Sequence, residues 1–162
     1  MTFSPELEAK FDKLLKSYPP DRVRSAVIPM LMYAQDELGC VSRELVEEVA
    51  RRCGVTALQV DEVVSYYSML RTRRLGKYHI QICTNISCLL RGADKLWEHA
   101  TRSLGIGNRE VTPDGLISLE EVECIGACSW APSLQVNYEF HHEMTLEKFD
   151  ALIESLRRTR TQ

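Results

Sequence analysis

The sequence lacks any run of about 18 apolar residues, the length that a membrane-spanning helix needs. Its first residues, MTFSPELEAKFDKLL, include acidic side chains and lack the basic-then-apolar layout of a secretory signal. They also lack the arginine- and serine-rich, acid-poor composition of an organelle transit peptide. These absences predict a protein of the cytoplasm with no direct insertion into a membrane.

An excess of charge of either sign is also missing. The 162 residues carry a net charge of −3, with 27% charged and 44% hydrophobic residues. This balance gives no reason to expect nucleic acid or a membrane surface as a partner. No glycine-rich phosphate loop follows a predicted strand, and no Ser/His/Asp arrangement has a recognisable local context. The chain therefore shows no nucleotide or substrate site of its own, and we expect no catalytic residue in it.

Residues 1–75 carry helical signals. Apolar side chains recur at helical spacing in four segments, and each segment follows a residue that can cap a helix. These capping residues are Ser4, Asp21, Ser42 and Thr56. Pro29 should kink or break the second helix. We predict an N-terminal helical bundle over 1–75, with the basic segment RTRRLG (71–76) as a solvated connector; a docking patch for an acidic partner is the alternative interpretation.

The hydrophobic period changes after Gly76. KYHIQIC alternates apolar and polar side chains, which predicts a strand, and a helical pattern follows it directly. GLISLEEVEC and SLQVNYEF predict two further strands, and TLEKFDALIESL predicts a terminal helix behind Thr145. The order β-α-β-β-α indicates a small mixed sheet with flanking helices over residues 76–162. The whole chain is therefore predicted to be α+β.

Four of the six cysteines form two pairs. CTNISC spans residues 83–88, and CIGAC spans residues 124–128. Each pair follows a predicted strand, so the two turns can meet at one edge of the sheet. In a reducing compartment, close cysteine pairs indicate metal binding or redox chemistry rather than structural disulfides. We therefore predict an all-cysteine metal site whose ligands are Cys83, Cys88, Cys124 and Cys128.

The spacing favours a binuclear iron–sulfur cluster without excluding other chemistry. Such a cluster needs two cysteines on each iron, and C-x4-C also occurs in plant-type ferredoxins. Structural zinc prefers tighter pairs, and thiol–disulfide chemistry commonly uses C-x-x-C; both alternatives stay open at this point. The helix start at Cys88 offers N–H groups to a negatively charged cluster. Gly126 permits a close approach of the backbone to the inorganic sulfides.

Residues outside the two pairs are not expected to be metal ligands. Cys40 and Cys53 are isolated in the sequence and are expected to behave as small hydrophobic side chains rather than ligands. Trp130, two residues after Cys128, either shields the cluster from water or wedges a loop.

The segments GKYHIQICTNISCLLRGADKLW and TPDGLISLEEVECIGACSWAPSLQVN carry a resemblance to a known family. They resemble the thioredoxin-like [2Fe–2S] subunit of the NADH-dehydrogenase module of respiratory complex I, which is an NADH-quinone oxidoreductase. VVSYYSML resembles the end of that family's N-terminal helical bundle. The resemblance implies a thioredoxin-like [2Fe–2S] ferredoxin domain over 76–162, with one cluster held by Cys83, Cys88, Cys124 and Cys128. Tyr66 and Tyr138 depart from the family pattern, and both lie outside this ligand set.

The resemblance also implies a role and a partner. The cluster would exchange single electrons with the FMN of an NADH-binding flavoprotein subunit, in a heterodimer within a larger NADH:quinone oxidoreductase. The chain alone would not be catalytic, and it would lie in a peripheral arm on the cytoplasmic side of the bacterial inner membrane. We expect the N-terminal helices to form much of the contact with the flavoprotein. Contributions to this contact are also expected from Arg71, Arg73 and Arg74.

Two other assignments compete with this one. The same family supplies the equivalent diaphorase subunit of NAD-linked hydrogenases and formate dehydrogenases, and nothing in these residues separates the assemblies. An assignment from a different class is a zinc-stabilised interaction module without redox activity. A visible absorption spectrum distinguishes the last, because an oxidised [2Fe–2S] protein is red-brown and a zinc protein is colourless.

Overall fold

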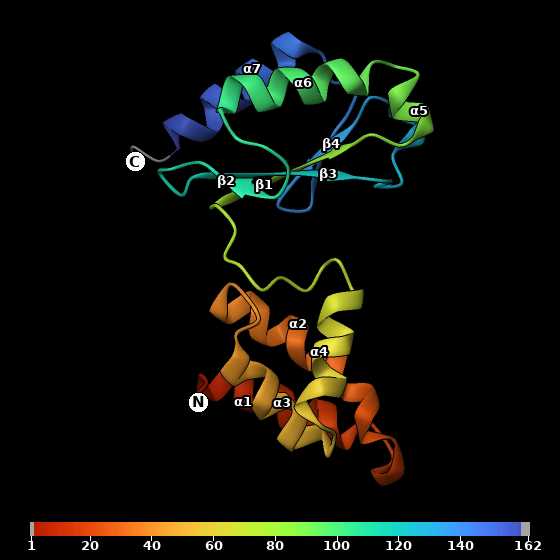
Figure 1. Ribbon diagram of the computed structural model, residues 1–162, viewed down its shortest axis with the longest axis vertical. Coiled ribbons are helices and arrows are strands. Elements are labelled where there is room, and N and C mark those ends of the chain that lie inside the picture. Colours follow the sequence, from red (N-terminus) through yellow and green to blue (C-terminus); the bar gives the residue numbers. More distant parts are fainter. Residues whose placement is uncertain (1, 160–162) are drawn as a thin grey trace. The chain divides into compact units, whose positions relative to one another are not determined.

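The computed structural model describes residues 2–159, and these form two compact units that divide between Arg74 and Leu75. The first unit is helical and the second contains a sheet (Figure 1). No helix within residues 2–159 is long and apolar enough to cross a membrane. The α+β class predicted from the sequence is confirmed.

Three helices of the first unit, α1, α3 and α4, begin where capping side chains were predicted. Its elements are α1 (Pro5–Lys16), the 3-10 helix η1 (Pro20–Ala26), α2 (Val27–Leu38), α3 (Arg43–Cys53) and α4 (Ala57–Tyr66). Ser4 and Ser42 each accept a hydrogen bond from a backbone N–H in the first turn of α1 and α3. Thr56 and Gln59 form the complete capping box of α4. These bonds satisfy N–H groups that have no partner within the helix.

The second predicted helix differs from the prediction. Asp21 lies in η1, and α2 begins only at Val27 without a side-chain cap. Pro29 therefore occupies the first turn of α2, where its missing N–H would have had no helical partner. The proline limits where the α-helix can begin and does not interrupt it.

The connector also begins later than predicted. Helix α4 ends at Tyr66. The segment that follows it is held to the first unit by hydrogen bonds with the Gln35 side chain. The Gln35 side chain donates to the Met69 carbonyl (2.9 Å) and accepts from the Arg71 N–H (2.7 Å). Val41 N–H donates to the Arg71 carbonyl at 2.7 Å. Arg71 thus has a fixed backbone within the first unit.

The core of the first unit consists of apolar side chains from every helix. The most completely buried of these are Phe11, Ala26, Met30, Leu31, Ala34, Leu45, Val49 and Val60. Each large side chain of this kind stabilises the fold by about 1.5–3 kcal/mol relative to an exposed position. Cys53 belongs to this core, with its Sγ 3.5 Å from Met30 Sδ.

The second unit is a mixed sheet with helices on one face. Its elements are β1 (Tyr78–Cys83), α5 (Ile86–Leu89), α6 (Ala93–Leu104), β2 (Glu110–Val111), β3 (Ile117–Val122), the 3-10 helix η2 (Cys128–Trp130), β4 (Leu134–Val136), β5 (Glu139–His141) and α7 (Leu146–Arg158). The strand order is β2-β3-β1-β4-β5, with β1 and β3 parallel and the other pairs antiparallel. Helices α6 and α7 lie together over the same face (Figure 1).

The core of this unit lies between that face and the two helices. Its fully buried side chains include Phe149 of α7 and four from the strands, namely Ile80, Ile82, Leu119 and Leu134. Alternation along each strand places His79 and Gln81 of β1, with Ser118 and Glu120 of β3, on the other face. The sheet therefore has one apolar and one polar side.

Two predicted elements of the second unit are each divided into two. The helical pattern after β1 forms α5 and α6, separated at Gly92, which has a φ of 92°. The predicted strand SLQVNYEF is wrong as a single strand, because it forms the hairpin of β4 and β5. Asn137 and Tyr138 form its two-residue loop with φ values of 46° and 76°. Positive φ at both loop positions is typical of the type I′ turn that joins antiparallel strands.

Gly76 has a role in packing. A Cβ atom at this position would lie 2.6 Å from the backbone carbon of Ile117 and 2.8 Å from the nitrogen of Ser118. These contacts are too short for any side chain, so only glycine allows the segment before β1 to lie against β3. The sequence predicted only that Gly76 ends a connector, and it did not predict this close approach to β3.

Candidate metal centre

The parallel pairing of β1 and β3 brings the two cysteine segments to one edge of the sheet. Cys83, the last residue of β1, is in register with Val122, the last residue of β3, two positions before Cys124. The Cys83 Sγ donates to the Glu123 carbonyl at 3.3 Å, which ties the first cysteine segment to the second. The carboxyl ends of neighbouring parallel strands commonly form binding sites in this way.

The first pair is buried. Cys83 and Cys88 are each 2% exposed and lie in a small apolar cluster with Ala93, Ala131 and Ile125. Asn85 accepts a hydrogen bond from the Ile86 N–H at 2.7 Å and thereby starts α5, the short helix that carries Cys88. This local turn directs the second thiol of the pair back toward the end of β1.

Burial controls the protonation of Cys88. It raises the pKa of the Cys88 thiol to about 11, although a backbone hydrogen bond from Ser133 favours the thiolate. A metal ligand must be the thiolate, so metal binding at Cys88 must displace a proton. The neighbouring thiols of Cys83 and Cys128 also raise this pKa, which means that both lie close to Cys88.

The second pair is exposed. Cys124 lies in the loop after β3 and Cys128 opens η2, with their Sγ atoms 3.9 Å apart. The prediction that Cys124 ends the strand is wrong by two residues. Gly126 between them has a φ of 79° and donates its N–H to the Cys124 Sγ at 3.4 Å. No heavy atom would lie within 4 Å of a Cβ at Gly126, so the backbone there faces open space.

The four thiols have the chemistry of the donor set that an iron–sulfur cluster uses. Among the residues that the structure describes, no three His, Cys, Asp or Glu side chains are arranged to hold one metal ion. An iron–sulfur cluster is held by cysteine thiolates, and two cysteine pairs lie at this sheet edge. Hydrogen bonds to sulfur tune such a cluster, and here Gly126 and Ser133 direct N–H groups at cysteine sulfur. The buried hydroxyl of Ser133 fixes the loop by donating to the Trp130 carbonyl at 2.7 Å.

Sequence reasoning missed the contribution of Ser133 and the position of Trp130. The Trp130 ring is 52% exposed and stacks on the His142 ring, with centroids 5.0 Å apart and an angle of 21°. A ring in this position does not wedge the inside of a loop. Nothing in the sequence indicated the stack, because it joins two loops that only the sheet brings together.

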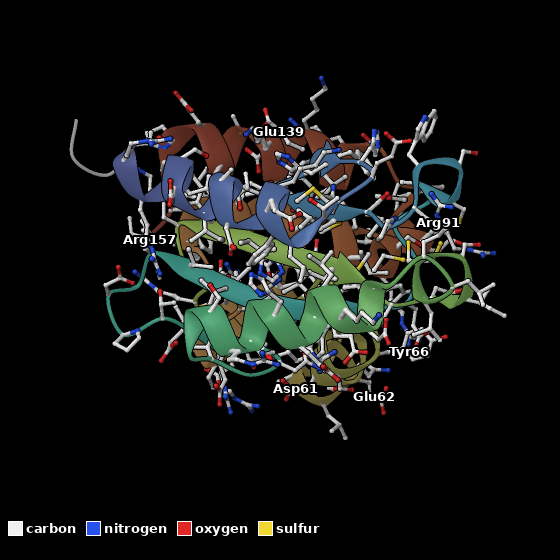
Figure 2. The ribbon with its side chains drawn as sticks, turned by 90° about the horizontal axis from the view of Figure 1, so that it is seen from above. Asp61, Glu62, Tyr66, Arg91, Glu139 and Arg157 are labelled. Carbon is white, nitrogen blue, oxygen red and sulfur yellow. The ribbon has the colours of Figure 1, made fainter. Side chains whose placement is uncertain are left out.

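Exposed apolar side chains of the α5 segment lie at the cysteine end of the unit. Ile86, Leu89 and Leu90 of the α5 segment are 67%, 48% and 80% exposed. Arg91, which follows them, marks this end of the unit in Figure 2, and Arg157 marks the opposite end of the helical layer. Cys40 and Cys53 belong to the helical unit, where burial raises the pKa of the Cys53 thiol.

Comparison with known proteins agrees with this site. Residues 11–157 match the family described as Thioredoxin-like [2Fe-2S] ferredoxin. The chain is 42% identical over 158 residues to NADH-quinone oxidoreductase subunit 2 of Thermus thermophilus, covering 97% of this chain and 87% of that protein. It is 41% identical over 157 residues to an NADH-quinone oxidoreductase subunit of Rhizobium meliloti, covering 97% and 90%.

A solved structure shares the fold. An NAD+-reducing [NiFe]-hydrogenase in its H2-reduced state superposes with a TM-score of 0.72 at 19% identity, over 82% of this chain and 22% of that chain. The family match confirms the [2Fe–2S] cluster predicted from the sequence over the zinc alternative. Since this match spans most of the chain, the protein belongs to the thioredoxin-like [2Fe–2S] ferredoxin family.

Proposed function

We propose that the chain is the electron-transfer subunit of an NADH-quinone oxidoreductase, with its [2Fe–2S] cluster held by Cys83, Cys88, Cys124 and Cys128. The observation that carries the proposal is the placement of two cysteine pairs at adjacent strand ends. It is supported by identities of 42% and 41% to subunits of that enzyme, each over 97% of this chain. Such a cluster supplies one-electron transfer when it is bound.

The residues of the site have separate tasks in this proposal. The buried pair, Cys83 and Cys88, keeps water from one side of the centre, and the exposed pair, Cys124 and Cys128, forms the side that faces an electron donor. The N–H groups of Gly126 and Ser133 stabilise negative charge on sulfur. The exposed apolar side chains of the α5 segment border the same end of the unit.

The electron donor belongs to another chain. This sequence has no dinucleotide-binding fingerprint, whereas NADH delivers a hydride that a flavin must divide into single electrons. We therefore place FMN and NADH on a partner flavoprotein subunit that forms a heterodimer with this chain. The assembly would be a peripheral arm on the cytoplasmic side of the membrane, without direct insertion of this chain.

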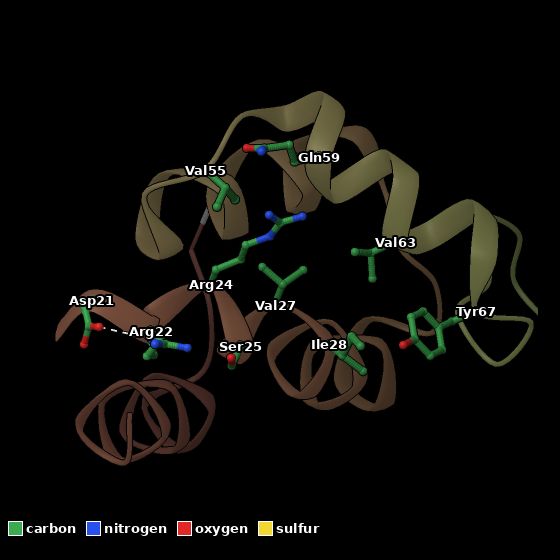
Figure 3. Close-up of a pocket in the computed structure, with 10 residues that line it drawn as sticks. All are labelled: Asp21, Arg22, Arg24, Ser25, Val27, Ile28, Val55, Gln59, Val63 and Tyr67. Atoms are coloured by element: carbon green, nitrogen blue, oxygen red, sulfur yellow. Dashed lines mark hydrogen bonds and ion pairs between the residues drawn. The ribbon is translucent and has the colours of Figure 1, made fainter. Parts of the chain in front are cut away.

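A groove on the helical unit is suited to hold the partner. It encloses about 410 Å³ between η1, the start of α2 and helix α4 (Figure 3). Val27, Ile28 and Val63 give it an apolar lining, and the Arg24 side chain extends into it. Within residues 2–159, the Arg24 guanidinium has neither an ion pair nor a hydrogen bond, although Asp21 pairs with its neighbour Arg22.

An unpaired cation above an apolar floor complements a segment that carries both apolar side chains and a carboxylate. We propose that such a segment of the flavoprotein occupies this groove. Residues 1–75 would then serve mainly in docking, and residues 76–162 would hold the cluster.

The cluster content of the purified chain tests the proposal. We expect about two irons and two acid-labile sulfides per chain after anaerobic preparation, with the red-brown colour of an oxidised binuclear cluster. The chain should also copurify with an FMN-containing NADH-binding subunit when the two are expressed together. Stoichiometric zinc without iron would contradict the proposal.

A further inference from the structure

The polar face of the sheet carries a buried ionic network that the proposed function does not use. His79 on β1 lies between Ser118 and Glu120 on β3, with distances of 2.9 Å from Nδ1 to the Ser118 Oγ and 3.1 Å from Nε2 to the Glu120 Oε2. These three residues are 6%, 1% and 8% exposed. Because a carboxylate only accepts hydrogen bonds, Nε2 is the donor to Glu120, while Nδ1 is hydrogen-bonded to the serine hydroxyl.

Strand register holds the network in place. His79 is paired with Ser118, and Gln81 is paired with Glu120 across the parallel β1–β3 ladder. Gln81 Nε2 donates to the Glu120 Oε2 at 3.1 Å, and Arg109 Nε lies 3.2 Å from the Oε1. The hydrogen bond from His79 lowers the pKa of Glu120, although burial alone would raise it. Glu120 is therefore a buried carboxylate that stays ionised.

This charge lies close to the cysteine end of the same two strands. Gln81, the partner of Glu120, is two residues before Cys83, which is about 7 Å along a strand. A buried charge two strand positions from a cysteine is screened less by water and salt than a charge on the surface. Burying a carboxylate is costly unless it is paired, and Glu120 has three partners, His79, Gln81 and Arg109.

We propose that Glu120 is a fixed negative charge that lowers the reduction potential of the cluster, with His79 and Gln81 as the residues that position it. The inference rests on the proposed ligand set at Cys83, Cys88, Cys124 and Cys128. Reduction adds one electron from an external donor to the cluster, and a nearby buried anion opposes that added charge. Glu120 acts through its electrostatic field and touches no reacting atom, so it is not a catalytic residue; His79 and Gln81 are the positioning residues.

Paramagnetic resonance during a redox titration of the full chain tests this role. Glu120→Gln keeps the shape and can keep the hydrogen bonds from His79 and Gln81 through its amide oxygen, while it removes the charge and the pair with Arg109. We expect it to raise the midpoint potential. The matched control is Glu121→Gln, because Glu121 is the next residue of β3 but is exposed and bonded to the Thr84 hydroxyl at 2.9 Å. The control should leave the potential unchanged.

A second variant changes the potential in the opposite direction. Arg109→Asn removes the cation beside Glu120 at a position with a φ of 61°, which asparagine tolerates. We expect a smaller, downward change, because the Arg109 side chain is 70% exposed. This variant serves the test if Glu120→Gln does not fold.

The outcomes separate this inference from the proposed function. If Glu120→Gln retains full iron and sulfide but has the wild-type potential, or if Glu121→Gln changes the potential as much, the inference is wrong and the proposed function stands. An upward change for Arg109→Asn would also overturn it. Absence of iron from the wild-type chain would overturn the proposed function first.

Discussion

At the scale of single residues, the four paired cysteines differ in their surroundings. Cys83 and Cys88 are buried beside small apolar side chains, whereas Cys124 and Cys128 face solvent. A buried thiol is surrounded by a fixed shell that positions it for a metal, and an exposed one depends on its own loop for position. The site combines a preformed half with a more accessible half.

Serine at any of these four positions should release or destabilise the cluster. A hydroxyl is a poor replacement for the soft thiolate that iron prefers, so each single Cys→Ser variant is expected to lose most of its iron. The matched controls, Cys40→Ser and Cys53→Ser, should keep it. Paramagnetic resonance of the reduced proteins and iron analysis measure the effect. An intact signal without Cys124, or a lost signal without Cys40, would contradict the proposed ligand set.

At the scale of elements, an ionic clamp joins α3 to α1. Arg52 on α3 forms two hydrogen bonds with Glu8 on α1, at 2.6 and 2.8 Å, and a third with Glu48 at 2.6 Å. Its guanidinium also lies 5.2 Å from the centre of the Phe11 ring. A charged side chain that is only 15% exposed thus covers one end of the helical core.

This clamp makes the stability of the helical unit depend on pH. Hydrogen bonding by Arg51 lowers the pKa of Glu48 from 4.5 to about 2, with a further contribution from Arg52 and against the effect of burial. A depressed pKa stabilises the fold above pH 4.5, and this contribution is lost as the pH falls from there toward 2. We expect Glu48→Gln to lower the free energy of unfolding by about 1 kcal/mol at pH 7, with a difference that shrinks below pH 4.5.

Urea unfolding followed by far-ultraviolet circular dichroism between pH 7 and pH 3 would measure this difference. The matched control is Glu47→Gln on the same helix, because Glu47 is 60% exposed and forms a surface pair with Arg43. It should change the free energy of unfolding by about a few tenths of a kcal/mol at most. A Glu48→Gln difference that is constant over the whole pH range would rule out the clamp as its source.

The groove of the helical unit is a second feature at this scale. Charge reversal by Arg24→Glu should weaken binding of the flavoprotein subunit at least tenfold, because it places like charges at the mouth of the groove. Lys13→Glu on α1 makes the same change of charge at an exposed position outside the groove and should bind nearly as well as wild type. Titration calorimetry with cluster-loaded chains measures both. Equal affinities for the two variants would exclude the groove as the docking site.

At the scale of the whole molecule, the chain divides its tasks between two units. The helical unit contributes no residue to the proposed ligand set, and a cluster needs no helical bundle to be held. The boundary between Arg74 and Leu75 is a property of the structure, whereas the assignment of docking to 1–75 and cluster binding to 76–162 stays a prediction.

The isolated chain should not oxidise NADH. A lone cluster accepts single electrons, whereas NADH delivers a hydride that a flavin must divide, so NADH–ferricyanide activity is expected only after the flavoprotein is added. A chain that starts at Gly76 should bind the flavoprotein less tightly than the full chain in a pull-down. Activity of the isolated chain, or equal binding by the shortened one, would contradict this division. The other chains that copurify distinguish a quinone reductase from a hydrogenase or formate dehydrogenase.

Local signals in the sequence determined much of this protein. The caps at Ser4, Ser42 and Thr56 were readable because each acts on the N–H groups of the next turn. The strand β1 was predicted from the alternation of its apolar and polar residues. Cysteine spacing and the family resemblance predicted an iron–sulfur centre, and the family match confirms the cluster. The identity of its four ligands stays a prediction.

Tertiary structure decided what depends on distant neighbours. The sequence carries only half of the signal for the turn at Asn137 and Tyr138, because asparagine commonly takes a positive φ but the second position usually holds glycine, not tyrosine. It could not pair Glu120 with His79, since that contact exists only when β1 and β3 lie side by side and in register. Hydrophobic periodicity indicates which face of a strand is buried, but it does not indicate which strand lies beside it. The charge beside the cysteines therefore became visible only in the folded chain.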